Sequence, residues 1–233
     1  MALFSFPMTT TELSIECHIP SNFMKSFCCS RIRRLEKWSR TAAIRTAAVL
    51  TLSSLFALSC IAGMEEGRQK SQVCAACHGA DGNSPSPNVP SIAAQPKQFI
   101  VTALYMYREG RRKSDVMSAF AEKLTNADLN DLAQYFSSQK LNSPLREAEA
   151  SVVSKGREIT EKNNCVACHT ANLVGQQHIP RLAGQHQAYL FEQLKLFKAA
   201  QRGDFDGTMT SAAQALLSED LELLSEYLST LNK

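Results

Sequence analysis

Apolar residues recur at helical spacing through most of the chain after residue 62, in segments separated by short polar stretches. This spacing predicts helices over residues 65–73, 97–109, 150–163 and 187–200. Thr125 and Asp128 have the spacing of a capping box, which predicts a helix that ends near residue 139. Ser218 is expected to cap a matching helix that runs to residue 231. No convincing alternating strand is present, so the predicted fold class is all-α.

The first 62 residues follow a different pattern. A basic segment over residues 31–45 precedes an almost wholly apolar run of about sixteen residues, shorter than the roughly twenty that a membrane-spanning helix needs. Small residues end the run, as in a secretory signal peptide. We therefore expect residues 1–62 to be a leader that is removed, with cleavage favoured between Ala62 and Gly63, and the protein to be periplasmic. An uncleaved anchor is the alternative.

The sequence after residue 62 contains an internal repeat. Cys74 and Cys165 are 91 positions apart, residues 90–95 recur as 180–185, and Leu129 recurs as Leu221. Such self-similarity indicates homologous units. We predict an N-terminal domain over 63–141, a linker over 142–149 and a C-terminal domain over 150–233. A linker of this length would let the loops at 86–95 and 178–185 meet across a pseudo-twofold interface.

The excess of positive charge comes from the first 62 residues. The chain has 25 Lys and Arg against 22 Asp and Glu, for a net charge of +3. Seven of the basic and three of the acidic residues precede residue 63, so 18 basic and 19 acidic residues remain. Nucleic-acid binding, which needs a basic stripe, gets no support.

Each unit contains one C-x-x-C-H motif. The copies are Cys74, Cys77 and His78, and then Cys165, Cys168 and His169. This spacing is typical of covalent haem c, because two thiols add to the vinyl groups of one porphyrin and the adjacent His ligates iron. A redox C-x-x-C motif is expected within a βαβ pattern, and a zinc site needs further Cys or His ligands nearby. The sequence shows neither the βαβ pattern nor the additional ligands. The sequence therefore predicts two covalently bound haem c groups.

These motifs, with C-A-A-C-H-G-A-D-G-N-S, P-R-L-A-G-Q-H and P-S-I-A-A-Q around them, resemble the class I cytochromes c and specifically the dihaem cytochrome c4 family, over residues 63–233. The resemblance implies two tandem class I cytochrome c domains, each wrapped around its haem. It also implies that each iron is held by the motif His and by a Met in the loop before the last helix. The matching positions are Met117 and Met209.

Other features enter through the same resemblance. The backbone carbonyls of Pro90 and Pro180 are expected to orient the motif histidines, as a contact that fixes an imidazole. Gly67 and Gly156 match a glycine that lets the first and last helices cross closely, although they stand at different distances from the Cys. Ala94 replaces the glycine found at position 184, so the first loop is expected to turn less freely.

Competing ligands have to be weighed against Met117 and Met209. Met106 lies among apolar neighbours of the 97–109 helix, where core packing explains it. His178 and His186 are conceivable axial ligands of the second haem, but Asn88 and Pro96 occupy the matching positions of the first unit.

Methionine in the sixth position leaves no vacant site for a substrate, so we expect electron transfer and no enzymatic activity. The leading hypothesis is a periplasmic dihaem c-type cytochrome that shuttles electrons one at a time between redox proteins of a respiratory chain. The expected donor is a cytochrome bc complex or a dehydrogenase, the expected acceptor is a haem-copper oxidase, and any membrane association would come through these partners. The alternative is the dihaem cytochrome subunit of a dehydrogenase or flavocytochrome complex.

A basic cluster precedes Met117. It is either a solvated helix end or a docking patch for an acidic partner, and it comprises Arg108, Arg111, Arg112 and Lys113.

Overall fold

The computed structural model describes residues 63–142 and 147–231, here called the N-terminal half and the C-terminal half. The predicted leader lies outside the described residues, as do residues 143–146 of the predicted linker. Within the described ranges, the backbone is helix, turn and loop, with a single isolated β-bridge between Gln176 and Ile179. The all-α prediction is confirmed.

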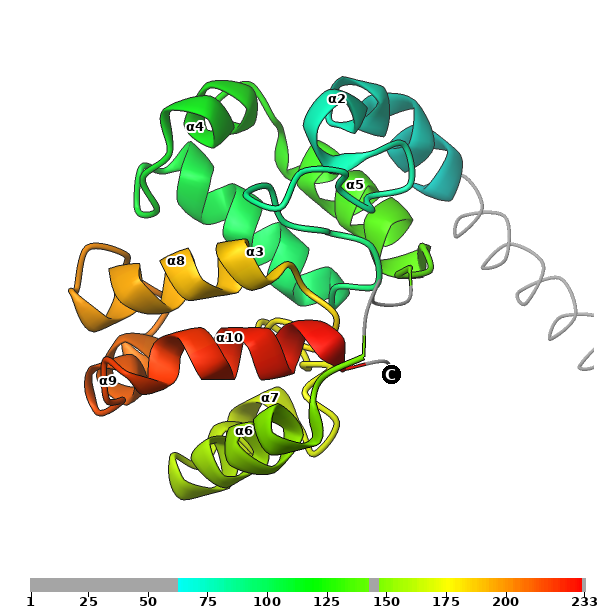
Figure 1. Cartoon of the computed structure of the whole chain (residues 1–233). Helices are drawn as coiled ribbons and strands as arrows, with labels where there is room; N and C mark the ends of the chain where they lie inside the picture. Colours follow the sequence, from blue (N-terminus) through cyan, green and yellow to red (C-terminus); the bar gives the residue numbers. More distant parts are fainter. Residues whose placement is uncertain (1–62, 143–146, 232–233) are drawn as a thin grey trace, which may run out of the picture. The chain divides into compact units, whose positions relative to one another are not determined.

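Both halves contain the same succession of helices (Figure 1). The N-terminal half begins with helical residues 63–70 and continues through η1 (Ser71–Val73), α2 (Ala75–His78), α3 (Lys97–Arg108), α4 (Asp115–Ala121) and α5 (Asn126–Ser138). The C-terminal half contains α6 (Ala150–Lys162), α7 (Cys165–His169), α8 (Gln187–Lys198), α9 (Thr208–Gln214) and α10 (Asp220–Thr230). The longer helices confirm the spacing-based predictions to within a few residues. The short helices α4 and α9 were not predicted.

One of the two predicted helix caps is confirmed and the other is wrong. Thr125 accepts from the Asp128 amide at 3.2 Å, and Asp128 Oδ2 accepts from the Thr125 amide at 2.8 Å, which completes the capping box. At α10 the N-cap residue is Glu219, and no side chain caps that end. Ser218 instead offers its backbone carbonyl to the Leu221 amide at 3.4 Å, so its hydroxyl plays no capping role.

Each half has its own apolar core. In the N-terminal half, α3 packs on α5 around Ile100, Leu132 and Phe136. In the C-terminal half, α10 packs against both α6 and α8, as Figure 1 shows, around a larger cluster that includes Leu190 and Leu228. Separate cores indicate that each half organises around its own centre.

The first and last helices of each half cross closely at a glycine, as the resemblance implied. A Cβ on Gly67 would lie 2.2 Å from the carbonyl oxygen of Asp131. A Cβ on Gly156 would lie 2.2 Å from Cγ of Tyr227. The different spacing of these glycines from the Cys therefore does not prevent the same crossing in both halves.

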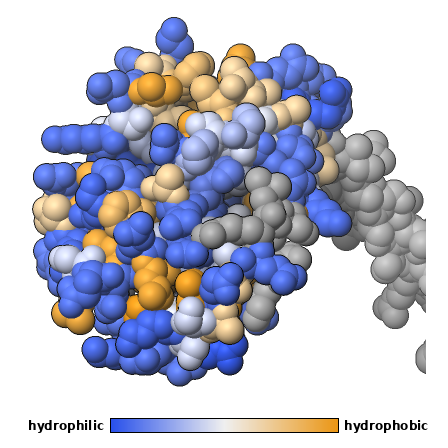
Figure 2. Space-filling view, in the orientation of Figure 1, coloured by the Kyte–Doolittle hydropathy of each residue, from blue (hydrophilic) through white to orange (hydrophobic). Residues whose placement is uncertain are grey.

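The visible surface is mostly polar, with apolar residues in separate groups between polar ones (Figure 2). The large apolar side chains that are exposed include Val73, Val116, Phe120, Phe205 and Leu217. Of the helices in the two described ranges, none has the length and apolar character that crossing a bilayer requires.

Candidate functional site

The two motif histidines are buried and held in the same way. His78 ends α2 and is 7% exposed, and its Nδ1 lies 2.8 Å from the Pro90 carbonyl oxygen. His169 ends α7 and is 6% exposed, and its Nδ1 lies 2.9 Å from the Pro180 carbonyl oxygen. A carbonyl only accepts, so each Nδ1 carries the proton and donates it. Each Nε2 therefore keeps a free lone pair, as a metal-binding imidazole requires.

Burial also favours the neutral form of these side chains. It lowers the pKa of His78 and of His169 below the ordinary value, although the proline carbonyls oppose the shift. The neutral imidazole is the form that binds iron. Burial likewise raises the pKa of the thiols of Cys74 and Cys165. The four motif cysteines form no disulfide, and Cys77 is the exposed one.

The residue after each motif adopts an unusual backbone conformation. Gly79 has φ 79° and ψ 156°, and Thr170 has φ 71° and ψ 161°. This region is essentially restricted to glycine. Thr170 is therefore strained, and its buried Oγ1 has no hydrogen-bond partner. The sequence analysis did not predict this strain. The signal was there, because Thr170 occupies the position in the second repeat that Gly79 occupies in the first.

The two methionines lie in the short helices α4 and α9, rather than in loops. Met117 is half-buried, and its amide donates to Ser114 Oγ at 3.2 Å. Met209 is also half-buried and packs against the core of the C-terminal half. Its amide donates to Asp204 Oδ2 at 2.6 Å. The equivalent methionine amides are thus capped by a neutral hydroxyl in one half and by a carboxylate in the other.

The three competing ligand candidates lie in different surroundings. Met106 is buried in α3, at 5% exposure, as expected for core packing. His186 crosses between the halves, with Nε2 at 3.0 Å from the Ser84 carbonyl oxygen. His178 lies near the surface, with Nε2 at 3.9 Å from Asp206 Oδ2.

The loops that carry Pro90 and Pro180 bind each other. Gln185 accepts from the Ser91 amide at 2.9 Å and donates to the Ser91 carbonyl at 2.7 Å. Gln95 accepts from the Arg181 amide at 2.9 Å and donates to the Arg181 carbonyl at 3.1 Å. These four residues occupy equivalent positions in the repeat, so the bonds are related by a pseudo-twofold operation. The predicted meeting of the two loops is confirmed.

The first loop makes the same turn as the second despite its alanine. Ala94 has φ 55° and Gly184 has φ 75°. Their amides donate to equivalent carbonyls of the last helices, Ala94 to Phe136 at 3.1 Å and Gly184 to Leu228 at 2.9 Å. The expectation that Ala94 would restrict the turn is therefore wrong, because this bond and the loop contacts hold it in the left-handed region.

The basic cluster before Met117 does not form one surface patch. Arg112 is only 7% exposed, so it cannot belong to a solvated helix end or to a docking patch. Arg108 is partly buried, and its Nη1 donates to the Leu124 carbonyl at 3.0 Å. Arg111 and Lys113 remain exposed.

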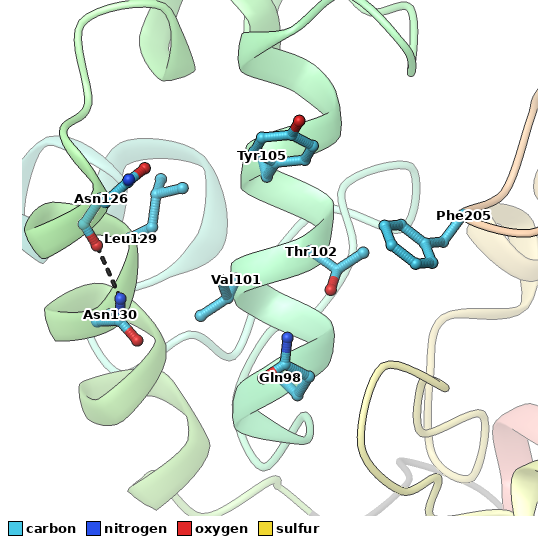
Figure 3. Close-up of a pocket in the computed structure, with 8 residues that line it drawn as sticks. All are labelled: Gln98, Val101, Thr102, Tyr105, Asn126, Leu129, Asn130 and Phe205. Atoms are coloured by element: carbon cyan, nitrogen blue, oxygen red, sulfur yellow. Dashed lines mark hydrogen bonds between the residues drawn. The ribbon is translucent and has the colours of Figure 1, made fainter.

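A cleft of about 310 Å³ lies along α3 and α5 (Figure 3). Val101, Tyr105 and Leu129 line it, and Phe205 of the C-terminal half approaches α3 at its edge. A second, more open cleft follows α6 around Val153 and Arg157. Neither cleft is lined by a motif Cys or His, so neither is the site that the two motifs predict.

Known proteins are similar to this chain along both halves. The cytochrome c family matches residues 153–232, and the family described as cytochrome C oxidase, cbb3-type, subunit III matches residues 64–136. Cytochrome c4 of Pseudomonas aeruginosa is 35% identical over 175 residues, which cover 71% of this chain and 87% of that protein. A protein of Thiomonas intermedia named thiosulfate dehydrogenase electron acceptor is 29% identical over 196 residues, covering 79% of this chain and 90% of that protein.

Solved structures give the same result. The crystal structure of reduced recombinant cytochrome c4 from Pseudomonas stutzeri matches with a TM-score of 0.67 at 33% identity, over 72% of this chain and 98% of that one. Similarity therefore extends over the fold, both motif-bearing halves and most of the relatives' length. The chain belongs to the cytochrome c4 family, and it is an electron-transfer protein with two covalent haem c groups.

Proposed function

We propose that this protein is a periplasmic electron carrier that moves electrons one at a time between redox proteins of a respiratory chain. The observation that carries the proposal is the pair of equivalent His–Pro sites, His78 with Pro90 and His169 with Pro180, on loops that bind each other. This arrangement would keep the two haems in one assembly, which favours transfer of an electron from one to the other.

Each half would hold one haem through its own motif. The proposed domains are residues 63–141 and 150–233, joined by the linker 142–149, with residues 1–62 as a cleaved leader. The proposed thioether and iron ligands are Cys74, Cys77, His78 and Met117 in the first domain, and Cys165, Cys168, His169 and Met209 in the second.

The donor set fits a low-spin haem iron. Nδ1 donation to the proline carbonyl fixes the imidazole ring and raises the basicity of Nε2. A thioether sulfur from Met117 or Met209 would complete the sixth position and favour ferrous iron. Bound haem c supplies reversible one-electron storage. If His78 and Met117, and likewise His169 and Met209, hold the two irons, neither haem would offer an open site for a substrate.

A second candidate is the electron acceptor of one dehydrogenase. The relative from Thiomonas intermedia is named for that role and covers 79% of this chain. The redox chemistry would be identical, and only the donor would differ. The other proposed donor is a cytochrome bc complex, and a haem-copper oxidase is the proposed acceptor.

The test begins with haem content. The pyridine haemochrome assay and intact mass of protein from a haem-attaching periplasmic host should give two covalent haems per chain and an N-terminus at Gly63. One haem per chain, or haem that acid acetone extracts, would contradict the assignment of the motifs.

The partner test then compares two donors. Reduction of the oxidised protein by membranes carrying a cytochrome bc complex should be fast, and the reduced protein should be oxidised by membranes carrying a haem-copper oxidase. Fast reduction by a purified thiosulfate dehydrogenase, with no response to the membranes, would favour the second candidate.

A further inference from the structure

One histidine of the C-terminal half reaches the loops of the N-terminal half. His186 directly precedes α8, and its amide donates to Gln185 Oε1 at 3.0 Å. Its ring Nε2 lies 3.0 Å from the Ser84 carbonyl oxygen and 3.5 Å from Ser91 Oγ. A carbonyl oxygen only accepts, so Nε2 carries the proton and donates it to Ser84. Nδ1 is then the ring nitrogen that can take a second proton.

Both serines belong to segments that hold the first motif, and both are buried. Ser84 Oγ donates to the Cys77 carbonyl at 3.1 Å. Ser91 follows Pro90, whose carbonyl oxygen lies 2.8 Å from His78 Nδ1. One imidazole of the C-terminal half therefore contacts both segments that fix the Cys and the His of the first site.

The repeat does not reproduce this contact in the other direction. Pro96 occupies the position of His186 in the first repeat, and a proline ring neither titrates nor donates a hydrogen bond. The Cys168 carbonyl of the second motif accepts from Gln176 Nε2 at 3.3 Å, within the C-terminal half. A titratable side chain from the opposite half thus contacts the first site, whereas a proline stands at the equivalent position for the second.

The charged side chains around His186 are bound elsewhere. The loop over residues 84–91 carries no charged residue, and α8 has no acid in its first turn. Arg181 Nε donates to the Ala94 carbonyl at 3.2 Å, and Lys97 donates to an amide oxygen of α5 at 2.7 Å. Within residues 63–142 and 147–231, His186 forms no ion pair with a carboxylate. A second proton on this ring would therefore add a positive charge without a paired anion.

We propose that His186 is a positioning residue for the first haem, and that it links the potential of that haem to pH. The proposal rests on the attachment of haem at both motifs under the proposed function. Histidine changes its charge between about pH 5 and 8. When an electron from a donor reduces the first ferric iron to ferrous iron, a proton from solvent would bind Nδ1 within that range.

The link has a definite direction. Positive charge beside a haem favours the ferrous state, because reduction adds an electron. The coupling between proton and electron is reciprocal, so protonation raises the potential and reduction favours protonation. In a molecule that holds one electron, that electron should therefore move toward the first haem as the pH falls.

The test measures the midpoint potentials of both haems from about pH 5 to pH 8 in the dihaem wild type and in His186→Gln. Glutamine keeps a side-chain N–H for the Ser84 carbonyl but does not titrate. Paramagnetically shifted haem-methyl NMR signals assign each potential to its haem. In the wild type, the first haem should shift to higher potential as the pH falls, and the second haem should shift less. His186→Gln should remove the larger shift of the first haem.

His178→Gln is the matched control. After residue 62, His178 and His186 are the two histidines outside the C-x-x-C-H motifs. The His178 variant should keep the wild-type profile, because its Nε2 lies near Asp206 of its own half. A second variant, His186→Asn, should flatten the profile as His186→Gln does and decides the question if the glutamine variant does not fold.

Three outcomes would overturn the proposal. The first is a wild-type potential of the first haem that stays constant across the range, a result that needs no variant. The second is a shift that persists in the His186 variants, which would assign it to the haem propionates. The third is a change in the low-spin spectrum of those variants, which would make His186 an iron ligand and no longer a positioning residue.

Haem content measured on the same samples separates this proposal from the proposed function. A chain without covalent haem would overturn both. A dihaem chain whose two potentials respond equally to pH would overturn the role of His186 alone.

Discussion

Gln95 and Gln185 each bind, through both atoms of the side-chain amide, the backbone amide and carbonyl of one residue in the opposite loop. Both glutamines are 4% exposed. The pairing resembles two rungs of a β-ladder, built from side chains in place of a strand. It connects the loops whose proline carbonyls hold the motif histidines, so a displacement of one loop is resisted by the other.

Replacing either glutamine by alanine should loosen this connection. Gln185→Ala leaves the amide and carbonyl of buried Ser91 without partners, and we expect a loss of about 1–3 kcal/mol in the free energy of unfolding. Gln95→Ala should cost a similar amount. Urea unfolding of the haem-loaded protein, followed at the Soret band, measures both. Gln98→Ala is the control, since Gln98 is exposed in the first turn of α3. Equal stability of the three variants would show that the bonds contribute nothing.

Methionine ligation predicts a spectroscopic loss. Met117→Ala and Met209→Ala should each remove roughly half of the near-infrared sulfur-to-iron charge-transfer band of the ferric protein. Met106→Ala should leave the band intact and cost about 2–5 kcal/mol of stability, because Met106 is buried. If Met106→Ala abolishes part of the band, the ligand assignment of the first haem is wrong.

The strained residue after the second motif offers a stabilising change. Thr170→Gly should raise the free energy of unfolding by about 1–2 kcal/mol, because glycine adopts this backbone region freely and no buried hydroxyl is left unpaired. Thr170→Ala removes the hydroxyl but keeps the Cβ, so it should recover only part of the gain. Thermal unfolding of the three proteins compares them. A glycine variant less stable than the threonine protein would contradict the strain.

The contact between the first and last helices of the N-terminal half predicts a pH effect. Lys70 lies 2.7 Å from Asp128 Oδ1 and 2.6 Å from Asp131 Oδ2. Hydrogen bonds from Lys70 and Thr125 lower the pKa of Asp128 from 3.8 to about 2. The folded state therefore binds this proton less tightly than the unfolded chain. Its contribution to stability is present above pH 3.8 and disappears as pH falls through about 2.

Asp128→Asn should accordingly cost less than about 1 kcal/mol at neutral pH, since the pair is partly solvated. The difference from the wild type should vanish near pH 2. Glu122→Gln, which removes an exposed carboxylate, is the control. Denaturant midpoints measured from pH 2 to pH 7 give both curves, and a constant difference across that range would refute the role of Asp128.

Much of this molecule could be predicted from its sequence because the signals are local or repeated. Helical spacing gave the α3, α6 and α8 segments, and the two C-x-x-C-H motifs gave the cofactor. The family resemblance supplied the contacts of Pro90 and Pro180 with the histidines. The same resemblance, which implies a haem edge left uncovered beside these loops, together with the repeat and a linker long enough for one unit to rotate, predicted that the two loops meet.

The features that escaped prediction depend on distant packing. Arg112 reads as one more charge in a basic cluster, and only the approach of Tyr189 and Gln193 from the other half explains its burial. Ser218 has the residue type of a cap, but the helix begins after Glu219 and does not use it. Ala94 reads as an obstacle to a turn, because its bond to Phe136 is invisible in a local pattern.

The Gln193 side chain shows what joining two copies in one polypeptide permits. A dimer of identical chains must repeat every residue on both sides of its axis. Here Gln193 receives both Arg112 and Arg202, while its counterpart in the first repeat is Ala103. Gln193 alone thus occupies space near the pseudo-twofold axis. In a symmetric dimer, two copies of this side chain would have to share that space. Covalent fusion has therefore freed each face of this junction to evolve on its own, so that two initially equal halves can become chemically different.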